Sequence, residues 1–402
     1  MKHLLLCDNI FISNEALETV DGYILVDGER IEKVVAGAPD SELLADYTVH
    51  DYRGKVITAG LIDAHTHLVH GGSRENELDM KLHGKTYMDI HRAGGGIFST
   101  MRATREASDV ELAEKALKSL DIMLRHGTTT VEAKSGYGLD LDNELRVLRL
   151  QKVLDEVQPV DIVSTYMGAH ATPPEFENDA DGYLRFIEEN VFPKVREEGL
   201  ADFADAFCED GIFSVDQMRE HLSEARRQGF ELKLHADEIE PMGGAELAAE
   251  LNCVSAEHLM AISDSGIEAM AESGTVAVVL PATSFFLRSE IYAPAKKMWE
   301  RGVRVAIATD YNPGSSPTEN LQQAMWNACY MMGLTPEQIL AGVTINAAYA
   351  IKREADIGSI EAGKRADFAI FDAPNIAHIV YHFGINRIHE VWKDGYIVHT
   401  AE

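Results

Sequence analysis

Two histidines in the first quarter of the chain have a spacing that suits metal binding. His65 and His67 end the stretch Gly60–His67, which follows the β-branched residues Val56 and Ile57. Alternate residues of an extended chain point to the same side, so both imidazoles can reach one metal ion at the end of a buried strand. The pair is equally compatible with two surface histidines in a turn. The choice between them depends on whether other elements supply further ligands.

Further side chains that could bind a metal or transfer protons stand at the ends of apolar runs elsewhere in the chain. The residues found there are Glu132, Lys134, His170, Cys208, Glu209, His235, Glu238, His258 and Asp310. An isolated His or Asp at the end of a strand is more often structural, but in a barrel of parallel strands all the carboxyl ends meet at one face. His65, His67, His235 and Asp310 would then form a His₃Asp set, which suits Zn²⁺ or Fe²⁺ in a hydrolytic role.

The middle of the chain has the alternation that such a barrel requires. Apolar runs alternate with amphipathic, charge-rich stretches such as Asp109–His126 and Val215–Gln228. The runs predicted as strands are Val56–Ala64, Thr128–Ala133, Asp161–Met167, Phe203–Phe207, Glu231–His235, Cys253–Glu257, Thr275–Leu280 and Val303–Thr309. This pattern predicts an α/β fold, a (β/α)₈ TIM barrel over residues 57–356.

The two ends of the chain are typical of short strands and tight turns. Asp27-Gly28 and Asp394-Gly395 each stand between strand-like runs and predict β-hairpins. Each terminal segment is too small for a core of its own. We therefore expect residues 1–56 and 357–402 to pair into one composite, sandwich-like β domain.

Composition excludes several classes of function. The formal net charge is −30 over 402 residues, which argues against nucleic acids and anionic membrane surfaces as partners. An anionic ligand would need a local Arg or Lys. The four cysteines form no CxxC pair, and no apolar run approaches a membrane span. We expect a cytoplasmic protein with free thiols.

Several longer motifs identify a family. GLIDAHTH at 60–67, KLHADE around His235, AEH at 256–258 and TDYNPGSSPTEN at 309–320 resemble the signature of the amidohydrolase superfamily. HGGSRENEL at 70–78, TTVEAKSGYGLDL at 129–141 and GAHATPPE at 168–175 resemble, in detail, one of its families. That family belongs to histidine degradation and hydrolyses the ring amide of 4-imidazolone-5-propanoate, giving N-formimidoyl-L-glutamate. The likeness covers nearly the whole chain.

The resemblance implies a set of site residues. The metal ligands match His65, His67, His235 and Asp310, and His258 matches a histidine near the metal-bound water. The positions that contact substrate match Arg74, Tyr87, Tyr137, His170, Glu238, Asn312, Gly314 and Ser315. Relatives with two metals bridge them with a carboxylated Lys after the fourth strand. Here Cys208-Glu209 stands there, so one metal is expected, although Lys134 on the second strand could play that part.

The residues themselves suggest how the proton transfers are divided. A metal lowers the pKa of bound water toward about 7 and polarises a carbonyl. Asp310 can accept a proton from that water, and His258 can hydrogen-bond the water or the oxyanion. Glu238 can deliver a proton to the leaving ring nitrogen. Alternatively, Glu238 orients His235 from behind.

The substrate, a small anionic heterocycle, also needs a cation. Arg74 can pair bidentately with its propanoate, unless it forms a surface ion pair with Glu75 or Glu77. Tyr87 and Tyr137 can add hydroxyl donors or simply pack at the barrel rim. His170 can donate to the ring carbonyl or be structural. Gly94–Gly96 has no following Lys-Ser/Thr, so we expect a loop near the site rather than a phosphate cradle.

Two other functions remain open from the sequence alone. A deaminase of a cyclic amidine would use the same metal ligands but would not need Arg74. A non-catalytic relative could lose ligands freely, whereas every expected ligand position is filled here. We also expect a homodimer.

Overall fold

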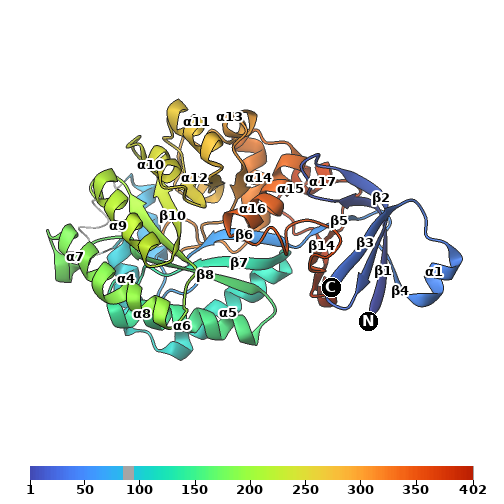
Figure 1. Ribbon diagram of the computed structural model, residues 1–402, viewed down its shortest axis with the longest axis horizontal. Helices are drawn as coiled ribbons and strands as arrows, with labels where there is room; N and C mark the ends of the chain where they lie inside the picture. The colour runs from blue at the N-terminus through green and yellow to red at the C-terminus, as the bar shows by residue number, and fades with distance from the viewer. Residues whose placement is uncertain (85–94, 402) are drawn as a thin grey trace.

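The computed structural model describes residues 1–84 and 95–401, which contain two separate sheets (Figure 1). One sheet comes from both ends of the chain and is called here the terminal sheet. Its strands are β1 (Lys2–Phe11), β2 (Thr19–Asp27), β3 (Arg30–Ala36), β4 (Thr48–Asp51), β5 (Val56–Ala59), β14 (Phe368–Phe371), β15 (Ile388–Lys393) and β16 (Tyr396–Thr400). They run in the order β16-β15-β14-β5-β1-β2-β3, with β4 paired to β1.

Both hairpins predicted from the sequence are present in this sheet. Asp27 pairs with Arg30 across the first turn, and Lys393 pairs with Tyr396 across the second. Gly28, Asp394 and Gly395 have φ values of 61°, 52° and 77°. In the second turn both central residues, Asp394 and Gly395, lie in the left-handed region that Asp-Gly favours. In the first turn Asp27 is the last residue of β2, and only Gly28 takes this conformation.

The second sheet is the predicted barrel of eight parallel strands. The strands are β6 (Leu61–Thr66), β7 (Thr128–Lys134), β8 (Asp161–Ala169), β9 (Phe203–Cys208), β10 (Glu231–Ala236), β11 (Ser255–His258), β12 (Val276–Val279) and β13 (Val305–Ile307). They lie in sequence order. Backbone bonds from His67 N to Tyr311 O (2.8 Å) and from Asp310 N to His65 O (3.1 Å) join the first strand to the segment after the last. The barrel therefore closes at its carboxyl end, where the two ligand-bearing segments meet.

Helices surround the barrel strands, as Figure 1 shows. The longer ones are α4 (Ile97–Glu106), α5 (Asp109–Arg125), α6 (Leu141–Val157), α9 (Val215–Arg227), α11 (Asp264–Ser273) and α14 (Leu321–Met332). The shorter ones are α1 (Ser41–Asp46), α2 (Leu78–Leu82), α7 (Ala180–Phe186), α8 (Phe192–Glu197), α10 (Gly244–Glu250), α12 (Pro281–Phe286), α13 (Ala295–Glu300), α15 (Pro336–Gly342), α16 (Ile345–Ala350) and α17 (Ile376–Tyr381), with single turns η1 (Glu75–Glu77), η2 (Pro174–Phe176) and η3 (Ile187–Val191). The buried faces of the longer helices pack against the strands and form much of the main hydrophobic core, whereas α1 has no buried residue and lies beside the terminal sheet, away from the barrel (Figure 1).

The predicted single strand Val56–Ala64 is wrong in one respect. The chain changes sheets at Gly60, so β5 belongs to the terminal sheet and β6 to the barrel. A Cβ atom at Gly60 would lie 2.2 Å from Thr129 Oγ1, which explains why a glycine stands at this crossing. Apolar periodicity could not show the change, because both halves are fully buried.

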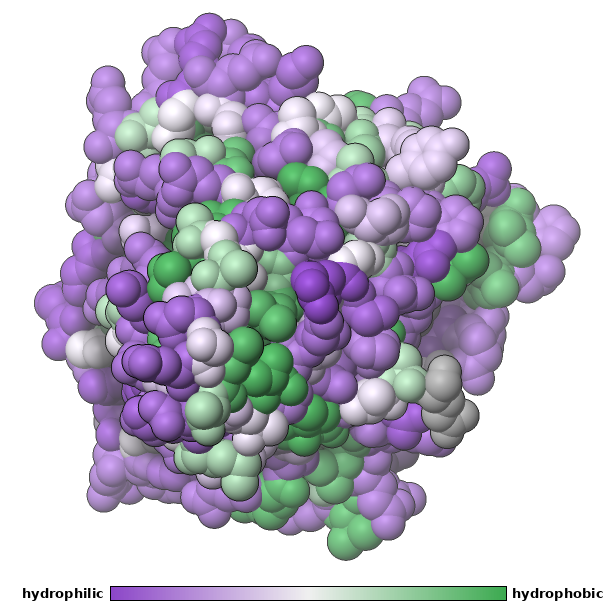
Figure 2. Space-filling view, turned by 90° about the vertical axis from the view of Figure 1, so that its right-hand side faces the viewer, coloured by the Kyte–Doolittle hydropathy of each residue, from purple (hydrophilic) through white to green (hydrophobic). Residues whose placement is uncertain are grey.

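The terminal sheet lies at one end of the barrel (Figure 1). Figure 2 shows this end of the molecule: hydrophilic residues cover most of it, and hydrophobic residues gather toward its centre. Exposed apolar side chains of this sheet include Val49, Tyr396 and Ile397. Among the described residues, no helix is long and apolar enough to cross a membrane.

Candidate metal centre and substrate site

The first two predicted ligands meet the fourth at the mouth of the barrel. Nε2 of His65 lies 3.4 Å from Oδ1 of Asp310, and Nε2 of His67 lies 3.7 Å from the same oxygen. The three side chains are at most 4% exposed. Asp310 holds a φ of 54°, a conformation that is costly for a non-glycine residue and common at functional sites. The HxH pair and the aspartate are thus brought to one point from opposite ends of the barrel sequence.

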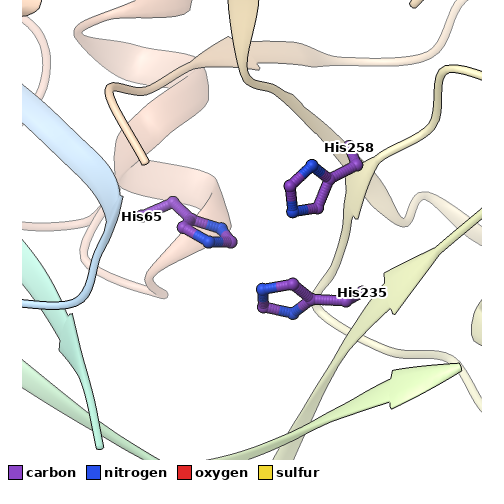
Figure 3. Close-up of side chains that lie close together, drawn as sticks. All are labelled: His65, His235 and His258. Carbon is purple, nitrogen blue, oxygen red and sulfur yellow. The ribbon is translucent and has the colours of Figure 1, made fainter. Parts of the chain in front are cut away.

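Two further histidines complete the cluster. His65, His235 and His258 each offer a ring nitrogen, and these atoms lie within 4.8 Å of one another; the same holds for His65, His67 and Asp310. Figure 3 shows the rings of His65, His235 and His258 arranged around a common space, each from a different strand end. The structure therefore unites all four predicted ligands around His65, and it adds His258 beside them.

The ring nitrogens of this cluster suit a metal. Nδ1 of His65 contacts Glu257 at 2.7 Å, and Nδ1 of His235 contacts Asp205 at 3.1 Å. Each carboxylate fixes the tautomer and leaves Nε2 as a lone-pair donor. Indeed, Nε2 of both histidines has no hydrogen-bond partner among the described residues, although both are buried. Burial, followed by the charge of Lys134, holds the pKa of His65 well below its usual value, which favours the neutral form that binds metal.

The carboxylate ligand is held in a similar way. Thr283 donates from Oγ1 to Oδ2 of Asp310 at 2.7 Å, while Oδ1 faces the two histidines. Burial raises the pKa of Asp310 to about 6, although the Thr283 hydrogen bond opposes that rise. The two oxygens of Asp310 consequently have different surroundings, one suited to a metal and one anchored to α12.

Beneath the ligands lies a set of five fully buried charged side chains, called here the inner cluster: Glu132, Lys134, Asp205, Lys233 and Glu257. Lys134 Nζ lies 2.8 Å from Glu132 and 2.7 Å from Asp205. Lys233 Nζ lies 3.5 Å from Glu132 and 3.9 Å from Glu257. Burial lowers the pKa of Lys134, but the charges of Asp205, Glu132 and Glu257 outweigh it, so that pKa is raised. Lys134 is therefore an ammonium ion in an ion pair, and carboxylation of its amine is disfavoured.

Glu238 lies beside the metal cluster rather than behind it. Its Oε2 is 3.5 Å from Nε2 of His258, and its side chain is 15% exposed. Asp205, and not Glu238, contacts Nδ1 of His235. Burial, with a contribution from Asp310, raises the pKa of Glu238 to about 8. A carboxyl that stays protonated near neutral pH has the form needed to donate a proton.

The predicted substrate residues after Asp310 form a tight turn next to Arg74. Asn312 Oδ1 accepts the backbone N–H groups of Gly314 and Ser315, both at 2.8 Å. A Cβ atom on Gly314 would lie 2.0 Å from Nη1 of Arg74, so the guanidinium lies directly against the turn. Arg74 also forms a bidentate ion pair with Glu77, at 2.8 Å for both bonds.

Tyr137 and His170 lie next to the ligand His67. Their ring centroids lie 5.4 and 5.1 Å from that of His67. Buried Glu144 accepts the backbone N–H groups of Gly136, Gly138 and Leu139, which holds the turn that carries Tyr137. The predicted substrate residue Tyr87 and the first glycine of Gly94–Gly96 lie outside the described residues.

Sequence reasoning missed the residues that support the site. Asp205, Glu257 and Thr283 were not singled out, and Glu77 was considered only as a surface partner of Arg74, whereas the ion pair that it forms is buried. Asp205 and Glu257 carried a readable signal, because each is a carboxylate inside a buried strand, the first between two alanines and the second directly after one. A buried carboxylate requires a partner. Thr283 carried no such signal, since Ser and Thr near the start of a helix are common.

Comparison with known proteins agrees with this architecture. The model of the amidohydrolase family matches residues 56–398. Imidazolonepropionase of Treponema denticola is 64% identical over 402 residues, which cover 98% of this chain and 97% of that protein. Imidazolonepropionases of Fusobacterium nucleatum and Streptococcus gordonii are 53% and 51% identical, over 97% and 96% of this chain and 93% and 91% of theirs.

Solved structures with the same fold are more distant in sequence. A 5-methylcytosine deaminase from Klebsiella pneumoniae superimposes with a TM-score of 0.77 at 15% identity, covering 100% of this chain and 98% of its own. A triazine hydrolase variant gives a TM-score of 0.76 at 16% identity, covering 99% and 94%. At these identities the likeness concerns the fold alone.

Proposed function

This chain belongs to the amidohydrolase family and, within it, to the imidazolonepropionases, and from that premise we propose how its residues act. The reaction is the hydrolysis of 4-imidazolone-5-propanoate at its ring amide, giving N-formimidoyl-L-glutamate. Water contributes a hydroxyl to the carbonyl carbon and a proton to the ring nitrogen that leaves. The observation that carries the proposal is the meeting of His65, His67, His235 and Asp310 beside Arg74 and its turn.

The metal would be held by the three histidines and Asp310. A divalent ion supplies a polarised carbonyl and an activated water at this position. Zinc and iron(II) both suit these ligands, and we propose one such ion per chain. The fit is supported by the Nε2 atoms of His65 and His235, which have no hydrogen-bond partner in the part of the chain that the structure describes, and by the ion pairs of Lys134.

Proton transfer would involve three side chains. Asp310 would accept the proton of the attacking water, because its carboxylate lies beside the histidines that would hold the metal. Neutral His258 hydrogen-bonds the developing oxyanion. Glu238, 3.5 Å from His258, delivers the proton to the leaving ring nitrogen.

Substrate binding would use the remaining residues of the site. Arg74 receives the propanoate, and Asn312, Gly314 and Ser315 line the adjoining surface with their turn. Tyr137 and His170 face the ring from beside His67, and Tyr87 is proposed on the family likeness alone. An acidic protein requires such a local cation, since its overall charge of −30 repels an anion.

The test is a spectrophotometric assay of purified protein together with elemental metal analysis. We expect the ultraviolet absorbance of imidazolonepropanoate to decay only in metal-loaded protein, and Arg74→Ala to raise KM strongly. An unchanged KM in Arg74→Ala would refute the role of Arg74. Absence of a bound transition metal, with no hydrolysis after one is added, would refute the metal-dependent reaction.

We also propose properties of the whole molecule. The boundary expected at residue 57 moves to Gly60, because β5 pairs with β14 in the terminal sheet. Residues 60–356 would form the catalytic unit, and residues 1–59 with 357–402 the accessory β domain. The four cysteines are unpaired, which supports a cytoplasmic location. The exposed apolar side chains on the face in Figure 2 support a homodimer, which a measurement of mass in solution would test.

A further inference from the structure

Glu77 is a buried carboxylate next to the proposed substrate site. Its side chain is 3% exposed, and that of Arg74 is 11% exposed. Nε and Nη2 of Arg74 donate to its two oxygens at 2.8 Å each, and the backbone N–H of Gly96 donates to Oε1 at 2.8 Å. One carboxylate therefore binds both the guanidinium and the backbone at the start of α4. Paired charges in such a buried position are held in one geometry.

The opposite side of the guanidinium is also confined. Nη1 lies against Gly314, where even a methyl group would overlap it at 2.0 Å. The turn containing Gly314 is itself rigid, because Asn312 Oδ1 accepts two of its backbone N–H groups. Arg74 is thus held between Glu77 and the turn. Glu77 occupies the Nε–Nη2 edge of the guanidinium, and the turn fixes the position of Nη1.

We propose that Glu77 is a positioning residue that determines selectivity for the carboxylate arm of the substrate. By occupying one edge of Arg74, it fixes which donors meet the arm and at what distance from the metal ligands. A substrate whose carboxylate arm has a different length, or that lacks the arm, would then gain little binding energy from Arg74. The inference rests on the proposed role of Arg74 and adds a residue that touches neither metal nor substrate.

The test compares two substrates in one variant. Glu77→Gln keeps the side chain's volume but loses the charge that orients Arg74. For imidazolonepropanoate we expect KM to rise by about 10- to 100-fold with kcat little changed, because hydrogen bonds to charged groups have that strength. For 4-imidazolone without the propanoate, kcat/KM should fall much less. The ratio of the two kcat/KM values does not depend on how much of the variant is folded.

Glu75→Gln is the matched control. Glu75 lies on the same turn, is exposed and contacts Ser73 rather than Arg74. We expect it to leave the ratio between the two substrates unchanged.

Three outcomes would overturn the proposal. Equal losses for both substrates in Glu77→Gln would indicate a merely structural role. A lower KM for imidazolonepropanoate would indicate that Glu77 competes with the substrate's carboxylate for Arg74. If Arg74→Ala abolishes the preference and Glu77→Gln does not, the role of Arg74 stands and that of Glu77 is refuted; if Arg74→Ala leaves the preference intact, the role of Arg74 itself is refuted, and the proposal for Glu77 falls with it.

Discussion

Two clusters that each combine acidic and basic side chains lie in different parts of the molecule. The inner cluster lies under the metal ligands, and its side chains are 0% exposed. The second, called here the outer cluster, joins the start of β8 to the terminal sheet, and its side chains are 4–36% exposed. The outer cluster consists of Asp161, Arg365, Asp367, Lys393 and Asp394.

What the two clusters contact differs. Lys393 Nζ lies 2.8 Å from both Asp161 and Asp367. The outer cluster therefore connects the barrel to the terminal sheet, and its ion pairs do not involve the predicted metal ligands. The carboxylates Asp205 and Glu257 of the inner cluster contact Nδ1 of two ligand histidines. Burying charge is costly, and well-packed apolar residues are often as stable. The outer cluster therefore holds the terminal sheet against the barrel, whereas the inner cluster orients the histidines that would bind the metal.

The largest effect is expected from Lys134→Met. The change leaves Asp205 buried without an ammonium partner and Glu132 with Lys233 alone, at 3.5 Å. We therefore expect the free energy of unfolding to fall by about 3–5 kcal/mol and the metal to be lost. Urea unfolding and metal content measure both. Adding Glu132→Gln removes one negative charge and should restore part of the stability. A loss of under about 1 kcal/mol, typical of surface pairs, would contradict our view of the inner cluster.

Asp205→Ala tests the orientation of a ligand directly. Without the carboxylate at Nδ1, His235 is free to change tautomer, so we expect metal affinity to fall by about 10- to 100-fold. Competition with a chelator measures this affinity. Asp202→Ala is the control, because Asp202 lies just before the same strand but pairs with exposed Arg353. Equal affinities in the two variants would remove the distinction between the clusters.

Lys393→Met tests the outer cluster. Arg365 still contacts Asp161 and Asp394, so the expected loss of unfolding free energy is smaller, about 2 kcal/mol. Metal affinity should stay at the level of the unchanged protein. The same two measurements apply, and a weakened metal site would show that the outer cluster reaches the ligands after all.

A further test of the site concerns pH. Burial raises the pKa of Glu238 from 4.5 to about 8, so the folded protein holds a proton that the unfolded chain releases. Stability of the metal-free protein must then decrease as pH rises from about 4.5 to about 8. Glu238→Gln should flatten that decline in urea unfolding at several pH values. If the stability of the variant falls equally steeply with pH, a group other than Glu238 has the raised pKa.

Much of the fold was predictable because it depends on local patterns. Strand and helix alternation predicted the eight-stranded barrel, and Asp-Gly pairs predicted both hairpins. The break at Gly60 was not predictable, since buried strands in either sheet have the same apolar composition. The point at which the chain leaves the terminal sheet depends on the strand that pairs with β5. That strand is β14, which lies far away in the sequence.

The sequence by itself determined the chemical types at the strand ends: imidazoles at 65, 67, 235 and 258, and a carboxylate at 310. Only the tertiary structure decided which carboxylates contact these side chains and fix their orientation. Glu257 meets His65 across 192 residues, and Asp205 meets Lys134 across 71. Such pairings depend on the register of neighbouring barrel strands and on which face each residue takes. The same holds for Arg74, whose contact with Gly314 becomes visible only when both loops are in place.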